Sequence, residues 1–164
     1  MRTARLRTTR RVATVALIAA GALLLAAGPA FAHVEADPNR VKPAKLATVE
    51  FTPEHGCGES VTTEMQFRVP KAARNATPVE LDGWTSTVKG RTITFESDTV
   101  PDEEASYGIT FTAPSTKTLL AWKVIQRCQD GVERWIDGPK GESPAPIVGV
   151  GKTPPAEEEE GDSH

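Results

Sequence analysis

The sequence predicts an all-β fold, an antiparallel sandwich of about seven or eight short strands. Apolar and polar residues alternate with period two through the middle of the chain, as in strands with one face on a core and the other in water. Turn-forming residues separate these runs at spacings of about 8 to 12 positions. No i, i+3, i+4 apolar stripe persists for three turns. The pattern therefore favours strands over helices.

The alternating runs follow one another along the chain. Their inward positions are Ala47, Val49 and Phe51; Val61, Thr63, Met65, Phe67 and Val69; Ile93 and Phe95; Tyr107, Ile109 and Phe111; and Trp122, Val124 and Gln126. Lys89-Gly90 and Asp130-Gly131 predict tight hairpins before residues 91–96 and 132–136. Prolines are expected between the strands, where a missing N–H costs no ladder bond. They stand at positions 38, 43, 53, 70, 78, 101 and 114.

Residues 1–32 have the order of a secretory signal peptide. Five arginines and no acid occupy residues 2–11, an apolar run follows to Ala27, and Ala30-Phe31-Ala32 is a small-x-small cleavage box. The alternative is an uncleaved membrane anchor, but the run of about 16 residues is short of the roughly 20 that span a bilayer. We expect cleavage after Ala32 and export to the cell envelope or the extracellular medium.

The processed chain is expected to form one domain, residues 33–151, followed by a disordered acidic tail, residues 152–164. The tail contains Pro154-Pro155 and four consecutive glutamates, a composition that buries too little apolar surface to offset its ordering entropy. Loss of the five leader arginines changes the formal net charge from −3 to −8. Such an acidic chain has no electrostatic reason to bind nucleic acid. No second apolar stretch follows the leader, so no membrane anchor is expected after cleavage.

The chain has two cysteines, Cys57 and Cys128. In an exported protein an even pair predicts a disulfide bond. The alternative is that their thiolates bind a metal. Cys57 lies just before one predicted strand and Cys128 near the end of another, so a bridge would tie strand ends or opposing sheets.

Histidine occurs three times, at His33, His55 and His164. Cleavage after Ala32 would leave His33 with a free α-amino group, which can close a chelate ring on one metal ion together with the imidazole Nδ1. This nitrogen pair suits the tetragonal preference of Cu(II). His55, in the turn beside Cys57, would be a third nitrogen ligand, or else a surface histidine without a role. His164 lies in the tail and is not expected to contribute.

The sequence lacks the residues that other metal sites and hydrolytic active sites need. A blue-copper site needs histidine and methionine soon after its cysteine, and a structural zinc site needs more cysteine or histidine than the chain has. No G-x-S-x-G motif and no serine with a plausible base histidine indicates a hydrolase.

Several segments, in order, resemble the YcnI-like copper-binding domain family. They are Ala32-His33-Val34, His55-Gly56-Cys57 followed by Thr62-Thr63, Gly83-Trp84, Gln126-x-Cys128 and Arg134-Trp135. The resemblance covers nearly the whole processed domain. It implies an immunoglobulin-like sandwich outside the membrane that holds Cu(II) through His33 with a tryptophan nearby, which by position is Trp135. Ordinary core packing is the alternative for Trp135, and we expect Trp84 and Trp122 to be core residues.

The chain departs from that family in two places. Where many members have a glutamate after the first strand, this chain has Glu54-His55-Gly56, so either Glu54 or His55 completes the site. Many members also end in a membrane helix, whereas this chain ends in an acidic tail and is expected to be released.

The sequence thus predicts a copper(II) chaperone or capture module rather than an enzyme. The resemblance implies copper-transport membrane proteins or other copper chaperones as partners. The alternatives are a histidine-brace oxygenase acting on a polysaccharide, which usually needs a flat aromatic face, and a metal-free interaction module. Aromatic residues make up only 5% of this chain.

Overall fold

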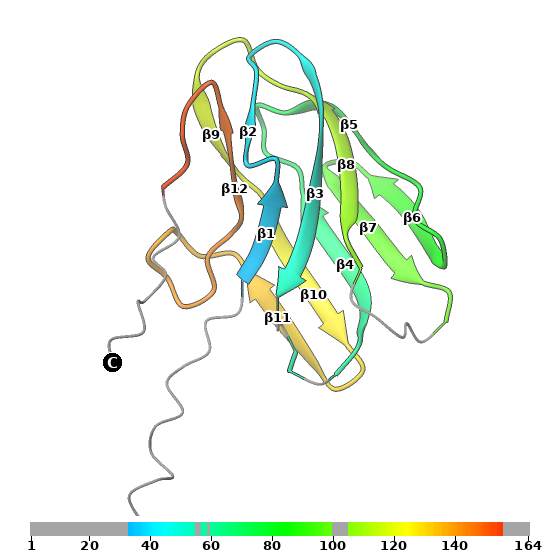
Figure 1. The fold of residues 1–164 in the computed structure, drawn as a ribbon. Coiled ribbons are helices and arrows are strands. Elements are labelled where there is room, and N and C mark those ends of the chain that lie inside the picture. The colour runs from blue at the N-terminus through cyan, green and yellow to red at the C-terminus, as the bar shows by residue number, and fades with distance from the viewer. Residues whose placement is uncertain (1–32, 55–56, 59, 100–104, 156–164) are drawn as a thin grey trace, which may run out of the picture. The chain divides into compact units, whose positions relative to one another are not determined.

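The structure, a computed structural model, describes residues 33–54, 57–58, 60–99 and 105–155. In this part of the chain twelve strands form three sheets (Figure 1). The first sheet has the order β1 (His33–Asp37), β3 (Leu46–Glu54), β8 (Tyr107–Thr112), β5 (Arg74–Pro78). The second has the order β11 (Gly131–Trp135), β10 (Lys123–Cys128), β4 (Thr62–Arg68), β7 (Thr92–Ser97), β6 (Trp84–Lys89). The predicted all-β class is confirmed.

A small third sheet contains β2 (Arg40–Val41), β12 (Ile147–Val150) and β9 (Thr118–Ala121). β2 and β12 run parallel, whereas the other strand pairs described are antiparallel. The strand count exceeds the expected seven or eight partly because strands such as β2 and β12 have only two and four residues. Such short segments carry too little alternation to be recognised from the sequence.

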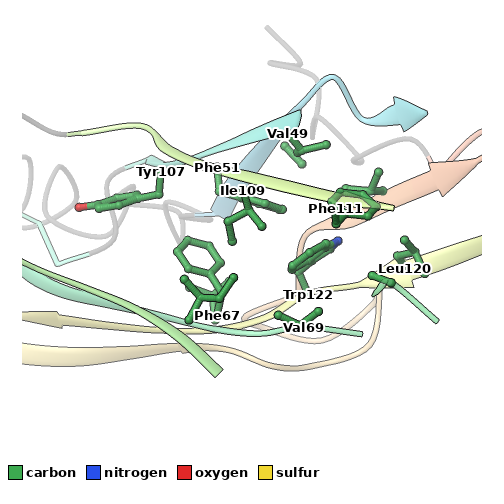
Figure 2. Packing of buried hydrophobic residues seen from close by; sticks show 14 of the residues in the cluster. Val49, Phe51, Phe67, Val69, Tyr107, Ile109, Phe111, Leu120 and Trp122 are labelled. Atoms are coloured by element: carbon green, nitrogen blue, oxygen red, sulfur yellow. The ribbon is translucent and has the colours of Figure 1, made fainter. Parts of the chain in front are cut away.

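The core lies between the first two sheets and is built around aromatic rings (Figure 2). Phe51 of β3 packs on Phe67 of β4 and on Trp122, with ring centroids 5.1 and 5.2 Å apart. Tyr107 of β8 packs on Phe95 of β7 at 5.3 Å and on Trp84 of β6 at 5.0 Å. β3 therefore faces β4, and β8 faces β7 and β6. The inward positions predicted in β7 and β8, and Trp122 with those in β10, are all fully buried.

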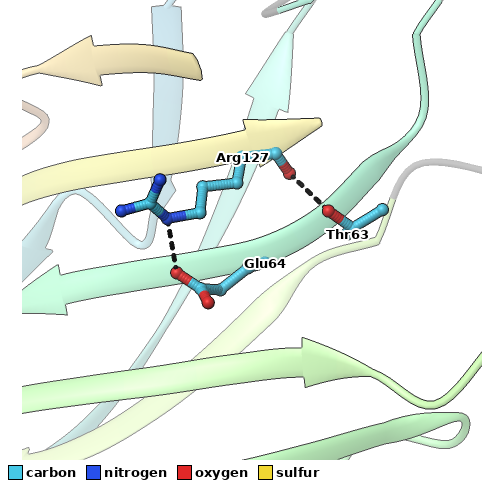
Figure 3. Close-up of polar contacts among 3 residues, drawn as sticks. All are labelled: Thr63, Glu64 and Arg127. Carbon is cyan, nitrogen blue, oxygen red and sulfur yellow. Dashed lines mark hydrogen bonds and ion pairs between the residues drawn. The ribbon is translucent and has the colours of Figure 1, made fainter. Parts of the chain in front are cut away.

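The start of β4 departs from the predicted alternation because of a β-bulge at Thr63. Arg127 of β10 pairs with Glu64, but the next residue, Cys128, pairs with Thr62, so Thr63 has no partner in the ladder. Its hydroxyl instead donates to the carbonyl of Arg127 at 3.2 Å (Figure 3). The bulge reverses the parity of the strand: Thr62 is buried, whereas Val61 and Thr63, which were expected to face inward, are only half-buried.

Pro53 was expected between strands but lies inside β3, opposite Val34 of β1. The other neighbour of β3, β8, pairs with it only as far as Phe51. Beyond that point β3 has a ladder on one side only, so a residue without an N–H is tolerated there. β3 consequently extends to Glu54.

Both predicted hairpins are present, each with its loop one residue away from the predicted position. Lys89 pairs with Thr92 and Cys128 with Gly131, so the loop residues are Gly90-Arg91 and Gln129-Asp130. Gly90 has a φ of 62°, a left-handed conformation that favours glycine at this turn.

Candidate functional site

His33 is the first residue of β1 and lies directly opposite Glu54, the last residue of β3. In β1 the side chains of Val34 and Ala36 are buried, so alternation directs His33 to the outer face of the first sheet. Glu54 points to the same face, and its Oε2 lies 3.2 Å from Nε2 of His33. The two side chains are 31% and 45% exposed, so an imidazole and a carboxylate meet at an accessible sheet edge.

The imidazole of His33 and the carboxylate of Glu54 are both groups that can bind a metal ion, but they are only two ligands. Within the residues described, no group of three or more His, Cys, Asp or Glu side chains could hold a metal ion. A site at His33 would therefore depend on one imidazole, on Glu54 and on the α-amino group that cleavage would create. His55 lies outside the described residues, so of the two residues weighed as completing the site, the structure places only Glu54.

Trp135 is 2% exposed and belongs to the core. Its Nε1 donates to Oε1 of Gln126 at 3.2 Å, and Nε2 of Gln126 donates to the hydroxyl of Thr62 at 2.7 Å. Both partners are buried, so these bonds satisfy three polar groups inside the sandwich. The indole N–H is thus occupied by Gln126, which leaves only the ring of Trp135 to border a metal.

β1 and β11 are the edge strands on one side of the sandwich, as their places beyond β3 and β10 require (Figure 1). Trp135 shares a cross-strand row with Val124 and Phe67, and Phe67 packs on Phe51, which pairs with Ala36 of β1. Trp135 is therefore on the same side of the sandwich as β1, near the level of Ala36.

The predicted disulfide between Cys57 and Cys128 is confirmed, with Cα atoms 6.4 Å apart and a sequence separation of 71. It joins the segment after β3, in the first sheet, to the end of β10, in the second. Because both sulfurs are in the bridge, thiolate binding of a metal is excluded in this state. A disulfide fits an oxidising compartment outside the cytoplasm. No helix in the described part of the chain is long and apolar enough to cross a membrane.

Sequence reasoning missed the roles of Thr62 and Gln126. The available signal was Gln126 itself, a polar residue at an inward position after Trp122 and Val124. A buried amide needs partners, but the alternation placed Thr63 rather than Thr62 on the inner face, so the partner could not be identified.

A family model described as "Domain of unknown function (DUF1775)" matches residues 33–150, and the chain belongs to this family. The match begins at His33, the residue after the predicted cleavage point. Among curated proteins, none matches the chain.

The solved structures that are similar to this one include an immunoglobulin-like protein and a cohesin module. A protein from Nocardia farcinica with an immunoglobulin-like fold is 23% identical, with a TM-score of 0.59 over 72% of this chain and 97% of that chain. A cohesin module from a family 33 glycoside hydrolase of Clostridium perfringens is 12% identical, with a TM-score of 0.43 over 63% and 87%. The first similarity shows that the fold is immunoglobulin-like.

Proposed function

We propose that the processed chain is an exported copper(II)-binding protein that captures or carries copper through His33. The observation that carries this proposal is the pairing of His33 with Glu54 at 3.2 Å on an accessible edge. The resemblance to the YcnI-like copper-binding domain family supports it. So does the family match, which begins at the residue that cleavage would make the N-terminus.

In this proposal the two imidazole nitrogens of His33 have different tasks. Histidine ligands usually donate their second ring N–H to a carboxylate, which fixes the tautomer and makes the ligating nitrogen more basic. Glu54 beside Nε2 suits that role, and Nδ1 is the ring nitrogen placed to close a chelate ring with the α-amine of the same residue. The Glu54 carboxylate also places a negative charge beside the cation. In the uncleaved chain the nitrogen of His33 is part of a peptide bond, so the chelate cannot form.

The position of the pair favours copper as a cargo. His33 and Glu54 are partly exposed on the outer face of the first sheet, next to its edge strand β1, where a partner protein can approach the metal directly. Copper-transport membrane proteins or other copper chaperones are the partners that the family resemblance implies. The low aromatic content supports capture or transfer over oxidation of a polysaccharide.

The deciding experiment compares protein beginning at His33 with protein that retains residues 28–32 before it. We expect one Cu(II) per chain in the first form and loss of tight binding in the second, because the longer extension moves the α-amine out of chelating reach of the imidazole while leaving the imidazole itself. Competition titration with a copper chelator measures both affinities. Equal affinities would contradict the proposal, and absence of binding in both forms would favour a metal-free interaction module. Peroxide production with a reductant would favour the oxygenase.

A further inference from the structure

The outer face of the second sheet carries four exposed cations that the proposed copper site does not use. Lys123 of β10 lies opposite Arg68 of β4, Arg68 lies opposite Thr92 of β7, and Thr92 lies opposite Lys89 of β6. Arg134 of β11 points outward in the next row, opposite Ile125. We call Lys89, Arg68, Lys123 and Arg134 the basic strip. It crosses the sheet from one edge to the other.

The charges of the basic strip are not neutralised within their rows. The other positions in these two cross-strand rows are occupied by threonine, isoleucine and glutamine. No acidic residue occupies a described strand position in either row. The acids Glu64 and Glu96 lie in the following row, and Glu64 is paired with Arg127 at 2.9 Å (Figure 3). Like charges directly opposite in a ladder, as at Lys123 and Arg68, are destabilising unless an anion compensates them.

We propose that the acidic end of this chain, residues 156–164, docks on the basic strip. This segment contains Glu157, Glu158, Glu159, Glu160 and Asp162, five carboxylates in nine residues and no cationic lysine or arginine. Of the formal net charge of −8 on the processed chain, these five carboxylates supply −5 and the rest of the chain −3, so the rest of the chain is acidic on balance and does not attract them as a whole. The basic strip is the complementary surface. The inference is independent of the proposed copper function.

The chain leaves the domain on the face where the basic strip lies. Val148 and Val150 of β12 point into the core, so Gly149 between them faces outward, where Lys152 and Pro154 pack against it. Gly149 pairs with Leu119 of β9. Leu120, Trp122 and Val124 are buried, so every second residue points inward without a break from β9 to β10. Leu119 and Lys123 therefore lie on the same outer face.

The segment is also long enough. Lys123 is four positions after Leu119, about 13 Å along an extended strand, and Arg68 lies about 5 Å further across the ladder. Glu157 and Glu160 follow Pro154 by three and six residues, which at about 3.3 Å each reach about 10 and 20 Å. The four glutamates therefore span the distance from Gly149 to the centre of the basic strip.

Docking of this kind depends on ionic strength. Exposed ion pairs are individually weak, but a tethered segment acts at a high local concentration. The interaction is expected to be present at about 0.01 M salt, where the Debye length is about 30 Å, and to be lost near 1 M, where it is about 3 Å.

A nitroxide attached through Ser163→Cys in the processed chain provides the test, because both native cysteines are in the disulfide. At low salt we expect the amide signals of Arg68 and Lys123 to lose intensity at least about twofold relative to 1 M salt. Those of Thr48 and Thr110, on the outer face of the first sheet, should not change. Lys123→Glu should weaken the effect, whereas Lys45→Glu, which reverses an exposed cation outside the strip, should preserve it.

Charge exchange completes the test. Replacing Glu157, Glu158, Glu159 and Glu160 by lysine should abolish the broadening, and combining that change with Lys123→Glu should restore part of it. Equal broadening at Thr110 and Lys123, or broadening that Lys45→Glu reduces as much as Lys123→Glu, would overturn the proposal. So would the absence of any broadening at low salt in a folded protein.

Discussion

At the scale of single residues, Glu54 is the residue that the β1–β3 pairing places opposite His33 in the proposed copper site. Glu54→Gln keeps the size of the side chain but removes its charge and weakens its acceptor. We expect Cu(II) affinity of the processed protein to fall about 10- to 100-fold, the usual effect of losing the carboxylate partner of a ligating histidine. Competition titration against a chelator measures the change.

Glu50→Gln is the matched control for that substitution. Glu50 lies on the same strand and the same outer face, opposite Asp37 rather than His33. Glu50→Gln therefore changes the surface charge by the same amount as Glu54→Gln but leaves the His33–Glu54 pair intact. If both variants lost affinity to the same extent, the effect would be general electrostatics, and Glu54 would have no specific role.

Gln126 is the residue on which the buried polar cluster depends, because it bonds both Trp135 and Thr62. Gln126→Leu leaves the indole N–H and the threonine hydroxyl without these partners inside the core. We expect a loss of about 1–3 kcal/mol in the free energy of unfolding, measured by urea denaturation. Gln66→Leu, at an outward position of β4, should change it much less. A stability loss at Gln66 equal to that at Gln126 would contradict this account.

At the scale of secondary-structure elements, the disulfide connects the two sheets beside the candidate site. The bridge closes a loop of about 70 residues, which in the chain-entropy model contributes about 4 kcal/mol to stability. Paired Cys57→Ser and Cys128→Ser substitutions should lower the free energy of unfolding by an amount near this value, measured by denaturant titration. Adding reductant to the wild-type protein should reproduce the effect. Reductant should not change the serine variant further.

At the scale of the whole molecule, the proposed function depends on a predicted covalent event, the removal of residues 1–32. Protein recovered from outside the cytoplasm should have the intact mass of a chain beginning at His33 with its two thiols oxidised. Replacing Ala30 and Ala32 by large residues should block processing. The uncleaved protein should then have no tight copper site. A different mature N-terminus would remove the basis for the chelate while leaving the fold unaffected.

Properties that depend on local pattern and on residue type could be predicted from the sequence. Period-two alternation indicated the strands around Phe51, Phe67 and Phe111, because the pleat puts every second side chain on one face. Because the chain has only two cysteines, a single disulfide pairing within the chain was possible. His33 was identified as a candidate ligand from its place after a predicted cleavage box, an argument that does not depend on the fold.

Features that depend on which strands are neighbours, and in which register, could be read from the folded structure but not from the sequence. His33 and Glu54 are 21 positions apart, and only the β1–β3 register places them opposite each other. The bulge at Thr63 turned Thr62 toward Gln126, and the early end of the β8 ladder allowed Pro53 inside a strand. Register is a property of paired strands, and a shift of one residue reverses every side chain, so no single segment could have specified these contacts.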